Sequence, residues 1–324
     1  MSQPSHPFHP ASRSPARRHE RVALWSDLML LAVAVVWGTS YGVVKSALVF
    51  YPVLGLLALR FGITFALLSP SLRALRHADA RTLRGVVGAG GVLFAIFLCE
   101  TFGVLLTRAA NAAFLISLCV VLTPLLEWPL LKRKPGGIEW AAVSLSLVGA
   151  WLLAGDVSLT LNTGDLLILA AALLRALNVC LTRRVMRTSA LPPLTVTAVQ
   201  SGVVAIGSVV AALTVAPDQW RHVPSFAAHS GFWFSVVYLI LACTLFAFFA
   251  QNYAIKRSSP TRVALLMGSE PAFGAVFACV WLGESIATRA WLGGGLIVAA
   301  SLLATVRWRP ASAAAAQSIE AQTP

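Results

Sequence analysis

The sequence predicts an all-α polytopic membrane protein of about ten transmembrane helices. Of its 324 residues, 58% are hydrophobic and only 11% are charged, and the mean hydropathy is +0.78. Soluble domains are far less apolar. The apolar residues form long runs, and Lys and Arg gather in alternate gaps between those runs. Both features are typical of a chain that crosses a lipid bilayer repeatedly.

Each apolar run is about as long as one membrane crossing. A hydrocarbon core of about 30 Å is spanned by about 20 residues of α-helix. The expected spans cover residues 28–48, 53–69, 85–106, 109–131, 138–154, 166–182, 194–215, 232–254, 263–282 and 290–306. The second, fifth and sixth of these are short, which leaves a count of nine as the alternative.

The two ends of the chain lack such runs. Residues 1–24 are rich in Ser, Pro, His and Arg and contain no apolar core, so they do not resemble a cleavable signal peptide. Residues 309–324 are rich in Ala and Ser. Both segments are expected to be disordered cytoplasmic tails, because neither can bury enough apolar surface to fold.

The basic residues set the expected orientation. With the N-terminus inside the cell, nineteen of the 25 Lys and Arg residues fall on the internal side, three fall outside and three lie within spans. Such a bias favours an even number of spans with both termini cytoplasmic, in the inner membrane of a cell. The net charge of +13 is explained in this way, so no nucleic-acid partner is expected.

The two halves of the chain align with each other. At an offset of 151 residues, Trp140 aligns with Trp291, and the third to fifth spans fall on the eighth to tenth without a gap. Repeats over residues 28–154 and 163–306 would each hold five spans. Because five is odd, the second repeat would enter the membrane from the opposite side, as in the inverted repeats of alternating-access transporters. Alignment by apolar composition alone is the alternative.

Three stretches of sequence resemble one transporter family. The first runs from Trp37 to Tyr41 and continues with Lys45 and Leu59-Arg60-Phe61. The second runs from Thr107 to Leu115. The third runs from Ser259 to Leu266 and continues with Glu270-Pro271 and Leu282-Gly283-Glu284. In this order they resemble EamA-type members of the drug/metabolite transporter (DMT) superfamily, over roughly residues 28–306. The resemblance implies a ten-helix inverted-repeat carrier that moves metabolites, often outward. The chain departs from the family pattern at Lys132 to Lys134, in place of an LGE-like end, and at Arg175, in place of an aromatic residue.

Five ionisable residues within the expected spans are functional candidates, because a charge at the bilayer centre costs about 2.5 to 3.5 kcal/mol on insertion scales. They are Lys45, Arg60, Glu100, Arg175 and Glu270. With both Glu residues ionised, they sum to three positive and two negative charges, which favours a solute that bears a carboxylate. Two hypotheses fit Glu100: it carries a proton through the transport cycle, or it forms a static ion pair with Lys45 or Arg60.

Six further candidates lie at similar depth: Trp37, Tyr41, Asn111, Asn178, Gln251 and Asn252. Their polar groups can bond either a solute or a neighbouring helix. Glu270 precedes Pro271, whose ring removes a helical hydrogen bond. Two interpretations are open: a helix broken there lines a cavity that binds solute, or the Glu270-Pro271 pair only shapes the helix. Gly38 and Gly42 are spaced for close helix packing.

These features favour a secondary transporter of an amino-acid-type or other small metabolite, an exporter working by alternating access, with proton coupling as one option. No catalytic residues are expected, because all six His lie outside the spans and no HExxH pattern occurs. The five Cys lack CxxC spacing, so no metal or other cofactor is expected. The chain is therefore expected not to be an enzyme. A membrane scaffold or receptor is the alternative, and a homodimer remains open.

Overall fold

The computed structural model describes residues 15–107, 109–155, 162–215, 217, 223–227, 229–282 and 287–305. Throughout these residues the regular structure is helical, with no strand, so the predicted all-α class is confirmed. The longer helices are α1 (Pro15–Leu48), α2 (Val53–Leu68), α3 (Ala80–Leu106), α6 (Gly137–Ala154), α7 (Thr163–Thr188), α8 (Pro193–Val215) and α13 (Thr288–Thr305). The shorter ones are the 3-10 helix η1 (Ser69–His77), α4 (Ala109–Ser117), α5 (Cys119–Leu131), α9 (Ser230–Ile240), the π-helix η3 (Leu241–Phe246), α10 (Ala247–Ile255), α11 (Pro260–Met267) and α12 (Glu270–Leu282).

Nine helical segments within the described residues are long and apolar enough to cross a membrane. One of them consists of the end of α4 together with α5, and another consists of α9, η3 and α10 in succession. The expected span over residues 263–282 falls on α11 and α12, which have 8 and 13 residues and are each too short to cross alone. Taken as one broken crossing, these two helices bring the total to ten.

The first helix begins within the segment where a disordered tail was expected. Residues 15–24 are the first turns of α1. The remainder of that segment, residues 1–14, lies outside the described residues, as does the whole of the second expected tail, residues 309–324.

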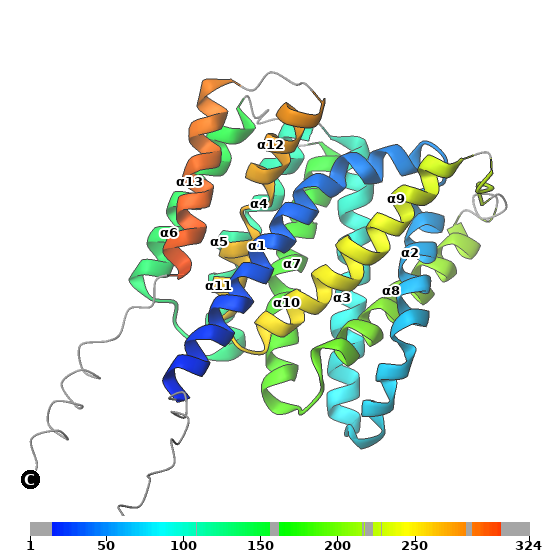
Figure 1. Ribbon diagram of the computed structural model, residues 1–324, viewed down its shortest axis with the longest axis horizontal. Helices are drawn as coiled ribbons and strands as arrows, with labels where there is room; N and C mark the ends of the chain where they lie inside the picture. The colour runs from blue at the N-terminus through cyan, green and yellow to red at the C-terminus, as the bar shows by residue number, and fades with distance from the viewer. Residues whose placement is uncertain are drawn as a thin grey trace, which may run out of the picture.

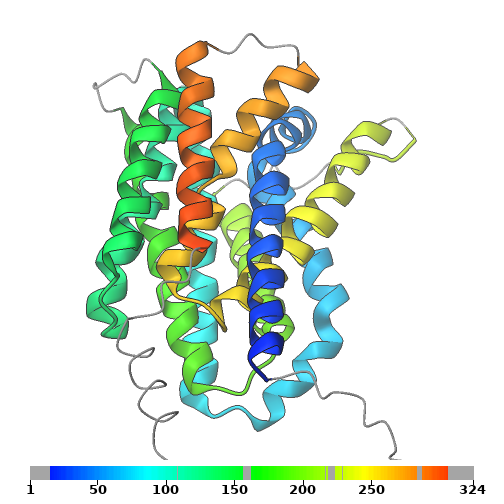
Figure 2. The same ribbon diagram turned by 60° about the vertical axis from the view of Figure 1, so that its left-hand side comes forward.

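Helices from the two halves of the chain pack against each other across the bundle. α6 packs on α13 at the left of Figure 1, α2 packs on α8 at its right, and α3 packs on α7 between them. Figure 2 shows α13 beside α6 from a second direction. α1 contacts α10 and α12, much as α7 contacts α3 and α5. α1 and α7 thus make similar sets of contacts in the two halves of the chain.

The element boundaries repeat the offset found in the sequence. α4 begins at Ala109 and α11 begins 151 residues later, at Pro260. The ends of α5 and α12, and both ends of α6 and α13, are separated by the same number of residues. The breaks coincide as well, because Leu118, between α4 and α5, aligns with Ser269, between α11 and α12.

The break between α11 and α12 has a local cause. Pro271 is the second residue of α12, where its missing N–H would have no helical partner in any case. Gly268 closes α11, and a Cβ atom added there would lie 2.5 Å from Cγ2 of Val120. The expected break next to Glu270 and Pro271 is therefore present, and it makes Glu270 the first residue of α12.

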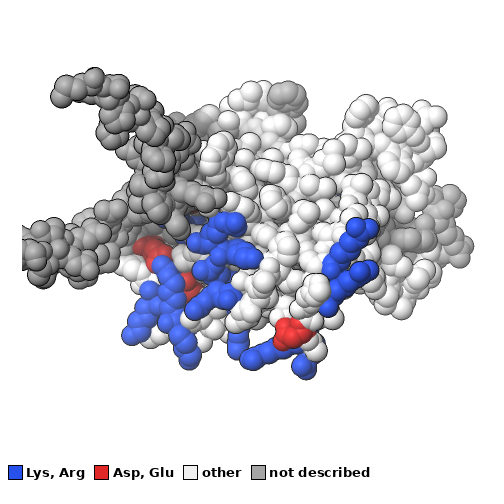
Figure 3. Space-filling model, turned by 60° about the horizontal axis from the view of Figure 1, so that its bottom comes forward, with Lys and Arg blue, Asp and Glu red and all other residues white. Residues whose placement is uncertain are grey.

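Basic side chains gather at one end of the bundle. Figure 3 views the bottom of Figure 1, and on this face Lys and Arg form several groups with few Asp and Glu among them. This end of the bundle is therefore rich in basic side chains.

Candidate functional site

An ion cluster joins α3, α7 and α12 inside the bundle. Nη2 of Arg175 lies 2.8 Å from each carboxylate oxygen of Glu100, and Nε lies 3.2 Å from Oε2. Nη1 of Arg175 lies 3.3 Å from Oε2 of Glu270. The side chains of Arg175, Glu100 and Glu270 are 21%, 14% and 7% exposed. One guanidinium near the middle of α7 therefore faces two carboxylates inside the helix bundle.

Trp37 connects this cluster to a second arginine. Its ring centroid lies 5.6 Å from Cζ of Arg175, and its Nε1 donates to the carbonyl oxygen of Cys243 at 3.0 Å. Buried Arg60 donates to the same carbonyl through Nη2 at 3.1 Å, and its Nε donates to the hydroxyl of Thr244. Cys243 and Thr244 belong to η3, and π-helical turns of this kind are frequent at functional sites.

Aromatic rings surround the guanidinium of Arg60. Cζ of Arg60 lies 5.2 Å from the ring centroid of Phe61 and 5.4 Å from that of Phe97. The ring centroid of Phe248 lies 6.1 Å from that of Phe97 and 5.5 Å from that of Trp37. Ring faces attract a cation, so these contacts offset part of the cost of burying Arg60.

α1 approaches α12 very closely beside the ion cluster. A Cβ atom on Gly38 would lie 2.6 Å from the carbonyl oxygen of Glu270 and 2.7 Å from the backbone nitrogen of Gly274. Because Gly38 has no side chain, the first turn of α12 can lie against α1, one residue from Trp37. This close approach places Glu270 within reach of Arg175.

Five of the eleven predicted site residues meet in this region: Trp37, Arg60, Glu100, Arg175 and Glu270. Glu100 pairs with Arg175, whereas the span depths had suggested Lys45 or Arg60. Lys45 lies in the last turn of α1 and is exposed. The side chain of Tyr41 lies outside the described residues.

Three of the four amide candidates form hydrogen bonds between helices. Nδ2 of Asn178 donates to the carbonyl oxygen of Ala89 at 2.7 Å, which ties α7 to α3. Nδ2 of Asn252 donates to the hydroxyl of Thr197 and to Gln200, each at 3.0 Å, which ties α10 to α8. Asn111 donates to Asp165 at 3.3 Å, and Gln251 is buried within α10.

Two buried carboxylates near the starts of candidate membrane spans, Asp27 and Asp165, are absent from the site residues predicted from the sequence. Asp27 pairs with Arg262, and Asp165 accepts from Asn111 and from the hydroxyl of Thr107. A signal for them was present: at an offset of 138 residues, Asp27-Leu28 aligns with Asp165-Leu166. The same offset places Trp37 opposite Arg175, so the two side chains that stack occupy equivalent positions in the two halves.

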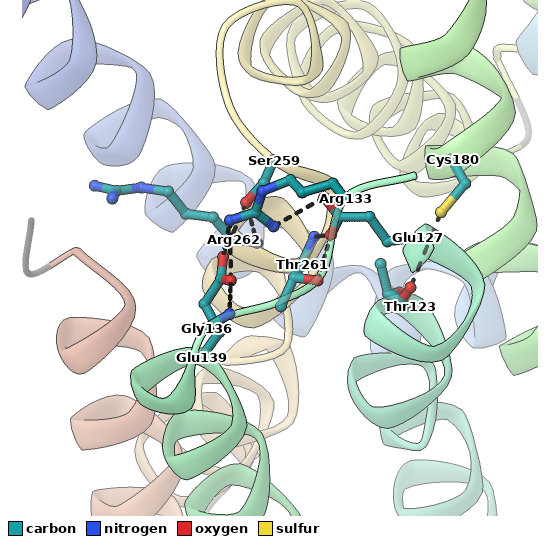
Figure 4. Close-up of polar contacts among 9 residues, drawn as sticks. All are labelled: Thr123, Glu127, Arg133, Gly136, Glu139, Cys180, Ser259, Thr261 and Arg262. Atoms are coloured by element: carbon teal, nitrogen blue, oxygen red, sulfur yellow. Dashed lines mark hydrogen bonds and ion pairs between the residues drawn. The ribbon is translucent and has the colours of Figure 1, made fainter. Parts of the chain in front are cut away.

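A second polar network links α5 and α6 to α11 (Figure 4). Fully buried Glu127 accepts from the backbone N–H of Thr261 at 3.0 Å and from Nη1 of Arg133 at 2.9 Å. Nη2 of Arg133 lies 2.8 Å from Oε1 of Glu139, which also accepts from the hydroxyl of Ser259 at 3.2 Å. The network borders a cavity of about 1330 Å³ whose lining holds more basic than acidic side chains.

The model of the EamA-like transporter family matches residues 24–155 and again residues 162–306. The chain belongs to the EamA-like transporter family. The family resemblance seen in the sequence is thereby confirmed, and with it the membership of a DMT-type transporter group. The two matches fall one on each half of this EamA-like transporter, as an internal repeat requires.

Relatives of this EamA-like transporter carry transporter names. A protein of Archaeoglobus fulgidus named "Uncharacterized transporter" is 27% identical over 292 residues, 88% of this chain and 87% of that protein. "Uncharacterized inner membrane transporter YedA" of Escherichia coli (strain K12) is 24% identical over 282 residues, 86% of this chain and 89% of YedA. A solved structure described only as "Crystal structure of protein" has a TM-score of 0.69 and 21% identity, and covers 86% of this chain and 96% of its own. That likeness concerns the fold alone.

Proposed function

We propose that this chain is a secondary transporter for a small amino-acid-type solute, and that the cluster of Glu100, Arg175 and Glu270 is its solute and proton site. The observation that carries the proposal is one guanidinium shared by two carboxylates, all three partly exposed inside the helix bundle. Intramembrane ionisable residues of this kind mark solute and ion pathways in transporters.

The repeat supports alternating access as the mechanism. Two inverted units can exchange their conformations, which opens a site between them first to one side and then to the other. The double family match, the shared offset of the helix boundaries and the packing of α3 on α7 favour this arrangement. The cluster lies where the halves meet, because Glu100 belongs to the first half and Arg175 and Glu270 to the second.

The charges of the site favour a zwitterion. Lys45 is exposed at the end of α1, so two Arg and two Glu residues remain, and their charges balance. A solute carboxylate can accept from Arg175, while an ammonium group can lie against a glutamate and the face of Trp37. The carboxylate-bearing solute expected from the sequence is retained, with an added positive group. Outward transport is carried over from the family resemblance.

A proton on the glutamate pair would complete the coupling. The trio of Glu100, Arg175 and Glu270 bears one excess negative charge, which one bound proton removes. Glu100 makes the closer contacts with Arg175, at 2.8 Å against 3.3 Å for Glu270. Glu270 is therefore the favoured proton acceptor of a coupled pair, whereas the sequence had suggested Glu100.

Proteoliposomes with an imposed proton gradient test this proposal against a panel of amino acids, organic acids and amines. We expect movement of at least one zwitterionic solute, accelerated by the gradient. Glu270→Gln should retain solute exchange but lose the response to the gradient, because an amide cannot release a proton. Glu100→Gln should weaken solute binding and shift the pH dependence of transport.

The outcomes separate the alternatives. If no solute moves in either direction, the carrier proposal fails and a scaffold or receptor role gains support. If both Glu variants keep the response to the gradient, the proton site lies elsewhere. Competition by amines but not by amino acids would exclude the zwitterionic solute.

We also infer an inner-membrane location with both termini on the cytoplasmic side. The basic end of the bundle in Figure 3 supports this orientation, because cytoplasmic loops carry the excess of Lys and Arg. A peptide tag at either terminus should be inaccessible to a protease added to right-side-out vesicles and accessible in inside-out vesicles. Cleavage of the tag in right-side-out vesicles would reverse the assignment.

A further inference from the structure

Two polar contacts close opposite ends of the bundle between equivalent helices. At the basic end, Nη2 of Arg262 on α11 lies 2.5 Å from Oδ2 of Asp27 on α1, and Nε lies 3.1 Å from Oδ1. At the other end, Nδ2 of Asn111 on α4 lies 3.3 Å from Oδ1 of Asp165 on α7, and the hydroxyl of Thr107 donates to the same carboxylate. Asp27 lies near the start of the candidate span Leu24–Leu48. Asp165, Asn111 and Arg262 lie in the first turns of α7, α4 and α11.

The two contacts are the same contact repeated. Asp27 and Asp165 occupy equivalent positions at the offset of 138 residues that aligns α1 with α7. Asn111 and Arg262 occupy equivalent positions at the offset of 151 residues that aligns α4 with α11. Because the repeats are inverted, one copy of the contact lies at each end of the bundle.

We propose that Asp27–Arg262 and Asp165–Asn111 are reciprocal locks, an inner lock and an outer lock, of which one opens while the other stays closed. The inference rests on the alternating access proposed above. Release of the inner lock frees α11 from α1, and release of the outer lock frees α4 from α7. α11 is followed by the break at Ser269, next to Glu270 of the ion cluster, and α4 is followed by the equivalent break at Leu118.

The inner lock is the stronger of the two. It joins two full charges through a bidentate contact, and Nη2 of Arg262 also donates to the carbonyl oxygen of Thr305 at 3.2 Å. The network of Glu127, Arg133 and Glu139 adds further bonds from α5 and α6 to α11 (Figure 4). The outer lock pairs a carboxylate with neutral groups, which form weaker hydrogen bonds than ions do. The solute-free protein should therefore open more often at the outer end.

Labelling of a buried cysteine from each side of the membrane tests the locks without any transport measurement. Ser269 is fully buried at the break between α11 and α12, and Ser269→Cys is a small change. A membrane-impermeant maleimide is added to inside-out or right-side-out vesicles, and labelling is read peptide by peptide by mass spectrometry. Native Cys180, fully buried, reports on general loosening.

We expect Asp27→Asn to raise the labelling rate in inside-out vesicles about tenfold, with little change in right-side-out vesicles. Asp165→Asn should raise the rate in right-side-out vesicles by a smaller factor. Arg262→Asn gives the inner lock the same amide partner that the outer lock has. This variant should reduce the difference in labelling rate between inside-out and right-side-out vesicles. Asp79→Asn is the matched control, because Asp79 is an exposed carboxylate at the start of α3 and should change nothing.

Three results would overturn the locks. They are an unchanged labelling rate of Ser269→Cys in the Asp27→Asn variant, an equal rise of that rate in both kinds of vesicle, or an equal rise in the labelling of Cys180. Failure of the proposed function is a separate result. If labelling changes as expected but no solute is ever moved, the locks stand without the transport role. If transport is found but labelling does not respond, the transport role stands without the locks.

Discussion

Replacement of Arg175 by Ala is expected to abolish transport and to destabilise the protein. The change removes the guanidinium that joins Glu100 to Glu270, whose side chains are only 14% and 7% exposed. Removing one partner of a buried ion pair costs about 3–5 kcal/mol. Uptake of a proton by the two carboxylates recovers part of that cost. Transport into proteoliposomes should fall to background, and the melting temperature in detergent should drop clearly.

Two further variants separate the roles of Arg175. Arg184→Ala is the matched control, since Arg184 lies on the same helix but is exposed, and both measurements should stay at the level of the unmodified protein. The double variant Arg175→Gln with Glu100→Gln removes both partners, so it should regain stability without regaining transport. Transport at the normal rate in Arg175→Ala would remove this cluster from the solute path.

The helices could be predicted closely because their apolar lengths are written in the sequence. The span expected over residues 138–154 is α6, Gly137–Ala154. The span expected over residues 166–182 is α7, which extends further, from Thr163 to Thr188. Hydropathy detects only the apolar part of such a helix. Its polar ends are set by capping, here by Asn162, whose side chain accepts from the N–H of Asp165.

The site was harder to predict, because depth in the membrane does not give the direction of a side chain. By depth, Lys45 and Arg60 were reasonable partners for Glu100. The structure instead pairs Glu100 with Arg175, from a helix 75 residues later in the chain. That pairing depends on how α3 packs against α7, which no local pattern specifies. Asp27 and Asp165 were overlooked because residues at the edges of spans are usually solvated.

Glycine spacing illustrates the same limit. The pair of Gly38 and Gly42 predicted a close helix contact, and both positions fitted it equally well. In the structure only Gly38 is in tight contact: a Cβ atom there would meet backbone atoms of α12 at 2.6 and 2.7 Å, whereas at Gly42 the nearest atom is 4.0 Å away, on the ring of Phe277. One turn of helix separates a position that tolerates no side chain from one that has room for it.

Gly38→Val is therefore expected to separate α1 from α12 and to impair transport strongly. The clashing atoms are the carbonyl oxygen of Glu270 and the nitrogen of Gly274, which belong to the backbone and cannot rotate away. Overpacking of this kind costs about 1–3 kcal/mol or more. Since Glu270 is the first residue of α12, any shift of α12 also lengthens its 3.3 Å contact with Arg175.

The measurements for Gly38→Val are the melting temperature in detergent and the initial rate of transport, with Gly42→Val as the matched control on the next turn of α1. We expect a lower melting temperature and a rate reduced about tenfold or more for Gly38→Val, and near-normal values for Gly42→Val. Gly38→Ala should fall between them, because its single methyl group meets the same two atoms. If the Gly38 and Gly42 variants behave alike, close approach of α1 to α12 does not position Glu270, and the ion cluster must be held by α3 and α7 alone.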